Sequence, residues 1–408
     1  MAYSITHDIT IAGRQVRNFY NLNIDKDINR LTDSGSITLP GHHYNRQINK
    51  SGITRGDKII IKVGYDGDNR QEFAGFVTSV SEVFDRFTID FEDYSFLFRH
   101  IVPPFQWIAQ ADYDALSVEE KRSAAPSPVK LIDILTYILE HNDGFERGEF
   151  RVNGDYDDDG QNSILQTQWT TFTIGESTTA YTVLKDIMEQ KLGLFHFKSV
   201  DTEGLPLRDP LTGDFQPQFR VGTFYLNQQK IASRTAKFNM GENVFSVSNL
   251  KHEWARRNSI EVIVTSQDPN TGTTLFSNTL RSDGYDLAPD AKTLRITVPG
   301  IPEGRKLADG VAIGQAEVNA IAARVLEQHT YTGLKGSFMA KLLPYCTTGY
   351  RISMDDPQHP REHVGSTAYE NSFGGDYICN TINLTIDNQR GSSREVGLGI
   401  RLPDETRL

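Results

Sequence analysis

Cysteine is scarce in this sequence, with only Cys346 and Cys379 among 408 residues. Two thiols in so long a chain cannot form the disulfide framework of a small secreted protein. Both lie in apolar, strand-like surroundings, so we expect buried free thiols. No apolar run approaches the roughly 20 residues of a membrane-spanning helix, and residues 1–7 lack the features of a secretory signal. These absences predict a soluble protein made in a cytoplasm, without stable membrane association.

The common catalytic motifs are also missing. The sequence contains no G-x-S-x-G, no P-loop and no G-x-G-x-x-G after a strand pattern, and no carboxylate pair stands out as a glycosidase dyad. Residues 359–363 (HPREH) match an inverted zinc-protease pattern. That chemistry needs a helix to bring both imidazoles to one zinc, and Pro357 and Pro360 disfavour a helix there. We therefore predict a protein that is not an enzyme, with no catalytic residues and no cofactor.

One acidic turn has the spacing of metal ligands. Asp155, Asp157 and Asp159 occupy positions 1, 3 and 5 of a calcium loop, and a glycine follows at the turn. Position 12 falls on Gln166, where a bidentate glutamate is expected, and no helical pattern leads into the turn. We favour a solvated acidic turn over a metal site, and these three aspartates are the candidate ligands if calcium binds in another geometry.

Basic residues are fewer than acidic ones, 42 against 53, which gives a formal net charge of −11. This balance argues against general binding to nucleic acids or anionic membranes, because both require clustered Lys and Arg. Arg256 and Arg257 form the best short basic pair, and solvated strand ends commonly carry such pairs. The ordinary share of charged residues, 23%, argues against wholesale disorder.

A β-pattern is present twice in the chain, near residues 22–93 and 247–402. Each copy opens with a strand in which apolar and polar residues alternate. It continues with a glycine-gated strand, meaning a strand directly preceded by a glycine, and an acidic turn, and it closes with a long hairpin. The glycine-gated strands are residues 56–61 and 349–354, and the hairpins are residues 73–91 and 377–402. The offset between Leu22 and Val247 is about 225 residues, too long for a solenoid. Duplication of a β-barrel is the simpler interpretation.

The strand after the opening strand has two candidate counterparts in the second copy. Residues 36–39 (SITL) match residues 259–262 (SIEV), and residues 35–39 also match residues 334–339 (LKGSFM). Two long polar segments, residues 41–57 and 355–376, occupy the same place in the two copies by this comparison. We therefore expect both to lie at the same end of the assembled protein and to contact a stacked partner.

We predict a mainly β fold with an α+β insertion. The first β-barrel domain covers residues 1–100, the inserted α+β domain 101–240, and the second β-barrel domain 241–408, interrupted by 267–330. The first inserted helix is expected to start with Ser127 as its N-cap and Pro128 at its first position. The apolar stripes of the two inserted helices are Leu131, Ile132, Leu135, Ile138 and Leu139, and Ala180, Val183, Leu184, Ile187 and Met188. A third helix is expected near 315–329.

These patterns resemble the central baseplate hub of contractile-tailed phages and related injection machines. This family includes the late control protein D group, the Mu-like tail hub and the T-even baseplate hub. The resemblance covers most of the chain as an order of elements and is best around residues 35–94. It rests on residues 9–14 (ITIAGR), 35–41 (GSITLPG), 55–63 (RGDKIIIKV) and 73–80 (FAGFVTSV), with residues 349–355 and 377–387 in the equivalent places of the second copy.

The resemblance implies a homotrimer in which two tube-protein-like barrels per chain form a pseudo-six-fold ring. Such a hub joins the hexameric tail tube to a trimeric central spike and lines the channel. The implied partners are a tail tube or tube-initiator protein, the central spike protein, a tape-measure protein and the baseplate wedge, with DNA only in passage. The protein would belong to the virion, in the tail baseplate, after synthesis in the bacterial host cytoplasm. We expect the spike to be a separate chain, and an acidic channel wall would repel DNA phosphate.

Two other readings come from different functional classes. A tail-associated peptidoglycan- or glycan-degrading enzyme would need a carboxylate pair, for example Glu176 or Glu189 with an aspartate of 155–159. A carbohydrate-binding β-protein would expose aromatic side chains such as Trp107 or Trp169.

Overall fold

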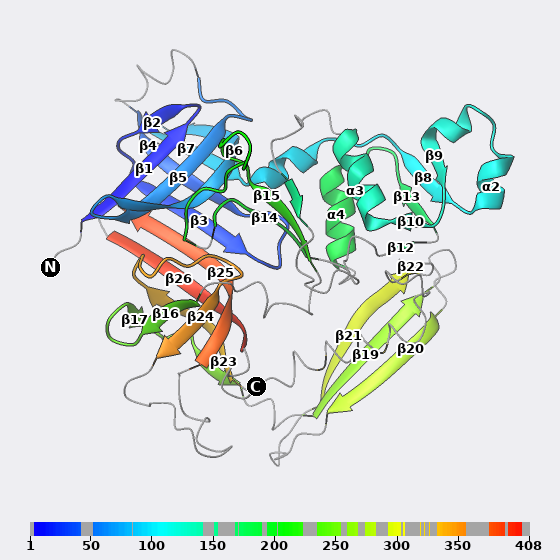
Figure 1. Ribbon diagram of the computed structural model, residues 1–408. Coiled ribbons are helices and arrows are strands. Elements are labelled where there is room, and N and C mark those ends of the chain that lie inside the picture. Colours follow the sequence, from blue (N-terminus) through cyan, green and yellow to red (C-terminus); the bar gives the residue numbers. More distant parts are fainter. Residues whose placement is uncertain are drawn as a thin grey trace.

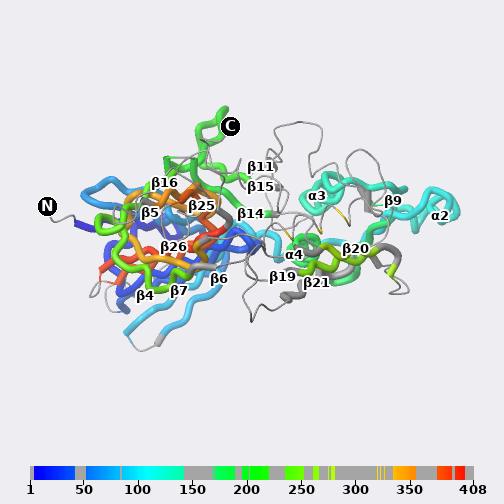
Figure 2. The backbone as a smooth tube through the Cα atoms, turned by 90° about the horizontal axis from the view of Figure 1, so that it is seen from below, coloured from blue at the N-terminus to red at the C-terminus, as the bar shows by residue number. Residues whose placement is uncertain are grey.

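The computed structural model describes much of the chain, including most strands of both β-copies. The described residues are 4–41, 52–83, 85–141, 151–153, 168–169, 171–189, 194–201, 203–222, 235–253, 259–267, 274–282, 293–302, 305–306, 319, 322, 326, 333–355, 375–387 and 391–401. Among them, no helix is long and apolar enough to span a bilayer. The described fold is mainly β with an α+β part, as predicted from the sequence. The two β-copies lie side by side at one end of the molecule and the helices lie toward the other end (Figures 1 and 2).

The first β-unit follows the order β3-β4-β7-β6-β5-β1-β2, and every pair is antiparallel. Its strands are β1 (Ile5–Ile11), β2 (Arg14–Val16), β3 (Asn21–Asp27), β4 (Ser34–Pro40), β5 (Lys58–Tyr65), β6 (Asp68–Val83) and β7 (Arg86–Glu92). Alternate residues along these strands are buried, because successive side chains point to opposite faces of a sheet. The buried faces surround one apolar core, to which all seven strands or their ends contribute.

The second β-unit repeats this order with its own core. Its strands are β16 (Thr235–Asn239), β17 (Val244–Ser246), β18 (Lys251–Glu253), β23 (Gly333–Ala340), β24 (Arg351–Asp355), β25 (Gly375–Asp387) and β26 (Gly391–Arg401). β17 and β18 pair with β23, which pairs with β26, then β25, then β24. One strand pair differs between the units, since β16 is parallel to β24 whereas its counterpart β1 is antiparallel to β5.

Equivalent hydrogen bonds confirm the glycine-gated strands as a repeated feature. Gly56 N–H donates to the carbonyl of Val77 (2.8 Å), and Val77 N–H donates to the carbonyl of Asp57 (2.9 Å). In the second unit Gly349 N–H donates to Cys379 (2.8 Å), and Cys379 N–H donates to Tyr350 (2.7 Å). Both glycines have positive φ, 93° and 81°. A left-handed backbone of this kind favours glycine, which explains why glycine precedes each strand.

The closing hairpins also match in register. β6 pairs with β7 and β25 pairs with β26, as the sequence predicted. Each long strand has a register irregularity directly after the residue that meets the glycine: between Val77 and Ser79 in β6, and between Cys379 and Thr381 in β25. A bulge inserts an extra residue and bends the strand. Each long strand can therefore pair with one neighbour through its first half and another through its second half.

The strand pairings identify the counterpart of β4 in the second unit. Residues 259–262 lie in β19 (Ser259–Gln267), which pairs with β20 (Thr274–Ser282) and β21 (Thr293–Pro302) in a separate sheet. The counterpart of β4 is instead β23, the other candidate. A short period-2 pattern such as S-I-x-[LV] fits any half-buried strand, so it could not distinguish the two.

The long polar segments 41–57 and 355–376 are not equivalent. The first connects β4 to β5, whereas the second connects β24 to β25. Because β24 is the counterpart of β5, the two segments leave opposite ends of equivalent strands. The expectation that they occupy the same place in the two copies is therefore wrong, whereas residues 42–51 and 356–374, on which the expected end and the partner contact depend, lie outside the described residues.

The α+β part contains two longer helices, α3 (Leu131–Glu140) and α4 (Ala180–Glu189). Its other elements are η1 (Tyr94–Arg99), β8 (Phe105–Ile108), α2 (Gln110–Ala115), η2 (Glu120–Ser123), β9 (Ala124–Pro126), β10 (Val129–Lys130), β11 (Arg151–Asn153), β12 (Gln168–Trp169), β13 (Phe172–Ile174), β14 (Leu194–Lys198), β15 (Gln218–Gly222) and β22 (Arg305–Lys306). The expected stripe of α4 is buried at all five positions.

The start of α3 differs from the prediction. Lys130, not Ser127, is the N-cap, and the Ser127–Pro128 peptide bond is cis. Asp133 accepts a hydrogen bond from the Lys130 N–H (3.0 Å), which satisfies a donor at the helix start. The fully buried face consists of Leu131, Ile134, Leu135 and Ile138, so Ile134 takes the place predicted for Ile132. The predicted Leu139 is partly buried and packs against the same core.

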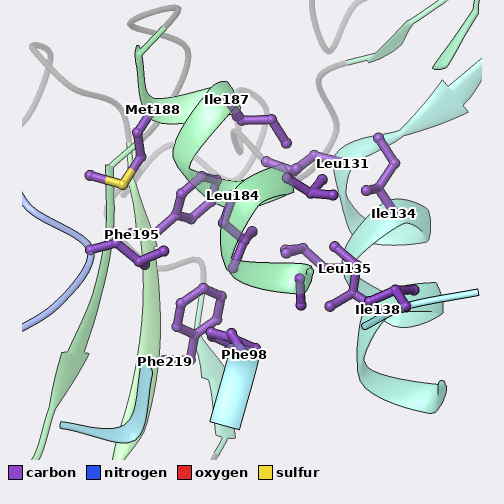
Figure 3. Packing of buried hydrophobic residues seen from close by; sticks show 14 of the residues in the cluster. Phe98, Leu131, Ile134, Leu135, Ile138, Leu184, Ile187, Met188, Phe195 and Phe219 are labelled. Carbon is purple, nitrogen blue, oxygen red and sulfur yellow. The ribbon is translucent and has the colours of Figure 1, made fainter. Parts of the chain in front are cut away.

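The helices form one core with parts of the chain that are distant in sequence (Figure 3). The buried side chains of α3 face Leu184 and Ile187 of α4, and Phe98, Phe195 and Phe219 pack beyond α4. Val262 and Val264 of β19 and Ala322 join the same cluster. Asn319, Ala322 and Leu326, the described positions of the third expected helix, are helical. The domain limits at 100 and 240 remain a prediction.

Candidate assembly surface

The two β-units are joined edge to edge into one continuous sheet of 14 strands. The second half of β25 pairs antiparallel with β3, from Thr381 opposite Asp27 to Asp387 opposite Asn21. Leu384 and Ile386 of β25 thereby enter the core of the first unit. The second unit therefore completes the core of the first. The β25–β3 junction shows how two such units associate.

One face of the joined sheet is polar and carries an open groove. The groove has a volume of about 600 Å³ and is lined mainly by polar side chains of β3, β4, β7 and β25. Asp25, Asp90 and Glu92 are its acidic lining residues, and Asn383 and Thr385 come from the second unit. The apolar residues that alternate with them in sequence face the core. This polar sheet face therefore spans the junction of the two units.

Cross-strand contacts fix the side chains of this face. Ser79 Oγ donates to Asp90 Oδ2 (2.7 Å), and the Thr38 and Thr88 hydroxyls are 3.3 Å apart. Arg30 lies at the end of the face and contacts the carboxylate of Asp25 (2.9 Å). The side chains of this face are held in place by contacts between neighbouring strands. The groove lining contains more carboxylate groups than basic side chains.

A buried ion pair connects the two units on the opposite, core-facing side. Arg394 of β26 contacts Glu72 of β6, and both side chains are almost completely buried. The same guanidinium donates to the carbonyl of Leu342 (2.7 Å), and Tyr345 donates from its hydroxyl to the carbonyl of Gln71 (2.9 Å). Removal of one partner of a buried pair leaves an unpaired buried charge, which typically costs about 3–5 kcal/mol. This network therefore fixes the relative position of the units.

The segment 199–204 of the α+β part is bound to the same junction. Gln71 Nε2 donates to the carbonyl of Ser199 (3.1 Å), and Gln71 N–H donates to that of Gly204 (3.1 Å). The Tyr350 hydroxyl donates to the carbonyl of Asp201 (2.6 Å). Polar bonds from both units thus hold this segment against the joined sheet.

A pair of carboxylates that the sequence did not reveal lies beside the end of β3. Asp93 caps η1 by accepting the Ser95 N–H (2.9 Å) and also accepts the Asp33 N–H (3.3 Å). Burial raises the pKa of Asp33 to about 7, and burial together with the charge of Asp33 raises the pKa of Asp93 well above its ordinary value. Both carboxylates bond to backbone groups, so their geometry indicates a structural role. The pair brings together residues sixty positions apart, and no local pattern reveals it.

The other sequence-derived candidates have varied outcomes. The two cysteines are buried and free, as expected. Trp107 and Trp169 are buried, so the reading in which they are exposed to bind carbohydrate is wrong. Glu176 is exposed in the turn before α4. The candidate ligands Asp155, Asp157 and Asp159 lie outside the described residues, as do Arg256, Arg257 and residues 359–363. Among the described residues, no group of three or more His, Cys, Asp or Glu side chains could hold a metal ion.

Comparison with solved structures places this fold among phage tail proteins. The chain is similar to a tail protein from Neisseria meningitidis MC58, with a TM-score of 0.55, 12% identity and 97% of each chain covered. It is also similar to the 43 kDa tail protein of prophage MuSo2 from Shewanella oneidensis, with a TM-score of 0.51, 12% identity, and 98% of this chain and 99% of that chain covered.

A third similar structure belongs to a larger assembly. It is a chain in the lidded Francisella PdpA-VgrG complex, with a TM-score of 0.51, 12% identity, and 99% of this chain and 53% of that chain covered. No protein-family model and no curated protein matches the sequence. The chain thus has the fold of phage tail and VgrG-complex proteins. At 12% sequence identity, these comparisons show the fold alone.

Proposed function

We propose that this chain is the structural hub of a phage or phage-like tail. Three copies form a ring of six β-units that joins the tail tube to the central spike and surrounds the channel. The observation that carries the proposal is the continuous sheet in which two β-units of the same order associate edge to edge. A chain that already contains two associated units needs three copies to present six similar units to a hexameric tube.

The polar sheet face is proposed to line the channel. It spans the junction between units, so it would continue around a ring of such units. Its groove lining contains carboxylates and neutral polar groups, which would limit the adhesion of DNA phosphate during passage. Fold similarity to phage tail proteins and to a VgrG-complex chain supports a structural tail role and a spike protein as partner.

Size-exclusion chromatography with light scattering tests the ring. We expect a species of three times the chain mass of 45.9 kDa in a concentration-dependent equilibrium with the monomer. A stable dimer with two-fold symmetry would contradict the proposal, because such a dimer pairs identical surfaces and cannot present six units around one axis.

Zymography on purified peptidoglycan tests the enzyme alternative. We expect no lysis from the purified protein. Lysis that is lost in Glu176→Gln would contradict a purely structural role, and lysis that persists in this variant would point to a contaminating hydrolase or to another carboxylate.

A further inference from the structure

The junction between the two β-units defines two strand edges by which units associate. One edge is the second half of β25, and the other is β3. Along this junction Asn383 lies opposite Asp25 and Leu384 lies opposite Ile24. Ile382, Leu384, Leu22 and Ile24 are all fully buried there, so the junction is part of a closed core.

Each edge has a counterpart elsewhere in the chain. The counterpart of the second half of β25 is residues 79–83 of β6, because Ser79 follows the bulge in β6 as Thr381 follows the bulge in β25. The counterpart of β3 is β17 with β18, because both pair with equivalent strands, β4 and β23. The carbonyls of Asn23 and Asn249 approach the equivalent glycines Gly35 and Gly336, which fixes the alignment of the two strands.

Both counterpart edges have a strand on one side only in the described part of the chain. Residues 79–83 pair with β7, whereas β5 pairs with β6 only from Asp68 to Phe76. β17 and β18 pair with β23. An edge of this kind presents backbone N–H and C=O groups that can pair with another chain.

Burial differs between the internal junction and these edges at equivalent positions. Val80 is 40% exposed, whereas its counterpart Ile382 is completely buried. Leu250 is only partly buried, whereas its counterpart in β3, Ile24, is completely buried. The apolar residues that the internal junction covers are therefore left partly uncovered at the two outer edges.

We propose that residues 79–83 of β6 pair antiparallel with residues 249–253 of a second copy of this chain, which are β18 and the two residues before it, in the register of the internal junction. Ser81 then lies opposite Lys251 of the partner subunit, as Asn383 lies opposite Asp25 within the chain. Val80 becomes covered as Ile382 is. The two surfaces are different, so the contact is head to tail and can be repeated from chain to chain.

The contact between chains is more polar than the internal junction. Glu82 stands where β25 has the buried Leu384, and Glu82 is exposed. Less apolar area is therefore covered, so we expect the contact to form reversibly, while the internal junction stays formed in every monomer. The inference rests on the proposed ring and adds to it the strands and the register.

Cysteine cross-linking of the full chain tests the register. Ser81→Cys and Lys251→Cys are made as separate variants, since both side chains are exposed and the native cysteines are buried. When the two variants are mixed and oxidised, we expect a covalent dimer that neither variant forms alone. The double variant Ser81→Cys/Lys251→Cys should give covalent species up to three chains on a non-reducing gel.

The matched control is Asp25→Cys/Asn383→Cys, which places cysteines at the equivalent positions of the internal junction. It should lose two reactive thiols on oxidation and remain a single chain on a non-reducing gel, which shows that this strand position permits a disulfide. A second control shifts the register by pairing Ser81→Cys with Phe245→Cys, and it should cross-link much less.

The outcomes separate this inference from the ring itself. If the internal control closes and light scattering shows a trimer, but the mixed variants give no covalent dimer, the strand pairing is wrong and the ring stands. If neither a trimer nor a covalent dimer forms at the highest soluble concentration, both are contradicted. Covalent species that grow without limit would support the strand pairing and contradict a closed ring of three chains.

Discussion

Asp33 and Asp93 show how single residues acquire properties that their neighbours in sequence do not specify. Each is an ordinary turn or cap residue in the sequence, and each accepts backbone hydrogen bonds in the structure. Their proximity and burial raise the pKa of both carboxyl groups. Lys26 opposes the shift of Asp33, and the charges of Asp25 and Asp27 add to it. The pair therefore links protonation to the stability of the end of β3.

The pH dependence follows from the sign of this shift. A carboxyl group with a pKa of about 7 in the folded state and 3.8 otherwise binds more protons when folded. Its contribution to stability is therefore complete below about pH 4 and is lost as the pH rises through about 7. We expect the denaturation midpoint to be lower at pH 8 than at pH 5, and this difference to be smaller in Asp33→Asn. Urea denaturation followed by circular dichroism measures both.

The exposed Asp112→Asn serves as the control and should leave the difference between pH 5 and pH 8 unchanged. An Asp33→Asn protein with the same pH dependence as the original would show that another group is responsible.

At the scale of elements, the bulged long strands β6 and β25 organise the molecule. Each turns from one neighbour to another at the bulge, so its first half closes its own unit and its second half is available to the next. In β25 the second half is covered by β3, whereas in β6 no described strand covers the equivalent half. The alternating apolar residues of the second half are therefore buried in β25, whereas Val80 in β6 is partly exposed.

Val80 and Ile382 provide a matched test of this difference. We expect Val80→Asp to change the free energy of unfolding of the monomer by less than about 0.5 kcal/mol, because the side chain is partly exposed. The same variant should lose the trimer, because the carboxylate would be buried at the contact between chains. Ile382→Asp should destabilise the monomer by about 3 kcal/mol or more, since it buries an unpaired charge. Chemical denaturation and light scattering separate the two effects.

A Val80→Asp protein that still forms trimers would contradict a role for this edge. A strongly destabilised Val80→Asp monomer would show that Val80 belongs to the core of its own unit.

For the whole molecule, the joined sheet divides the surface into a core-facing side and the polar sheet face. The core-facing side is held by the Arg394–Glu72 pair and by the segment 199–204. The polar sheet face is free of both. This division leaves one continuous surface on which a channel can be lined by side chains from both units.

The charge of this surface can be tested with DNA. We expect the original protein not to retain short duplex DNA at about 0.15 M salt, because clustered cations are required for such binding. Lysine substitutions at Asn23, Asn383 and Thr385 should produce binding that weakens steeply with added salt, measured by fluorescence anisotropy. The control carries the same added charge at exposed positions far from the sheet, Ala111, Ala115 and Val118. DNA binding by the original protein, or equal binding by the control, would contradict the proposed channel wall.

Local patterns in the sequence predict the repeated β-order, the glycine-gated strands, the hairpins and the apolar face of α4. These features depend on local periodicity and on the backbone freedom of Gly56 and Gly349, so they are visible in short windows. The same windows could not choose between residues 259–262 and β23, because both are half-buried strands. They also misplaced the start of α3 by three residues, since Lys130 and not Ser127 is its N-cap.

Which strand edges are covered depends on contacts between distant parts of the folded chain. β3 and β25 are separated by more than three hundred residues, and their pairing depends on the bend at a bulge and on the shape of two cores. The Arg394–Glu72 and Asp33–Asp93 contacts likewise join distant positions. Edge pairing leaves no periodic trace in a sequence, since covered and free edges carry the same alternation. For that reason the sequence predicts the duplication, but it does not predict the surfaces that join one unit to the next.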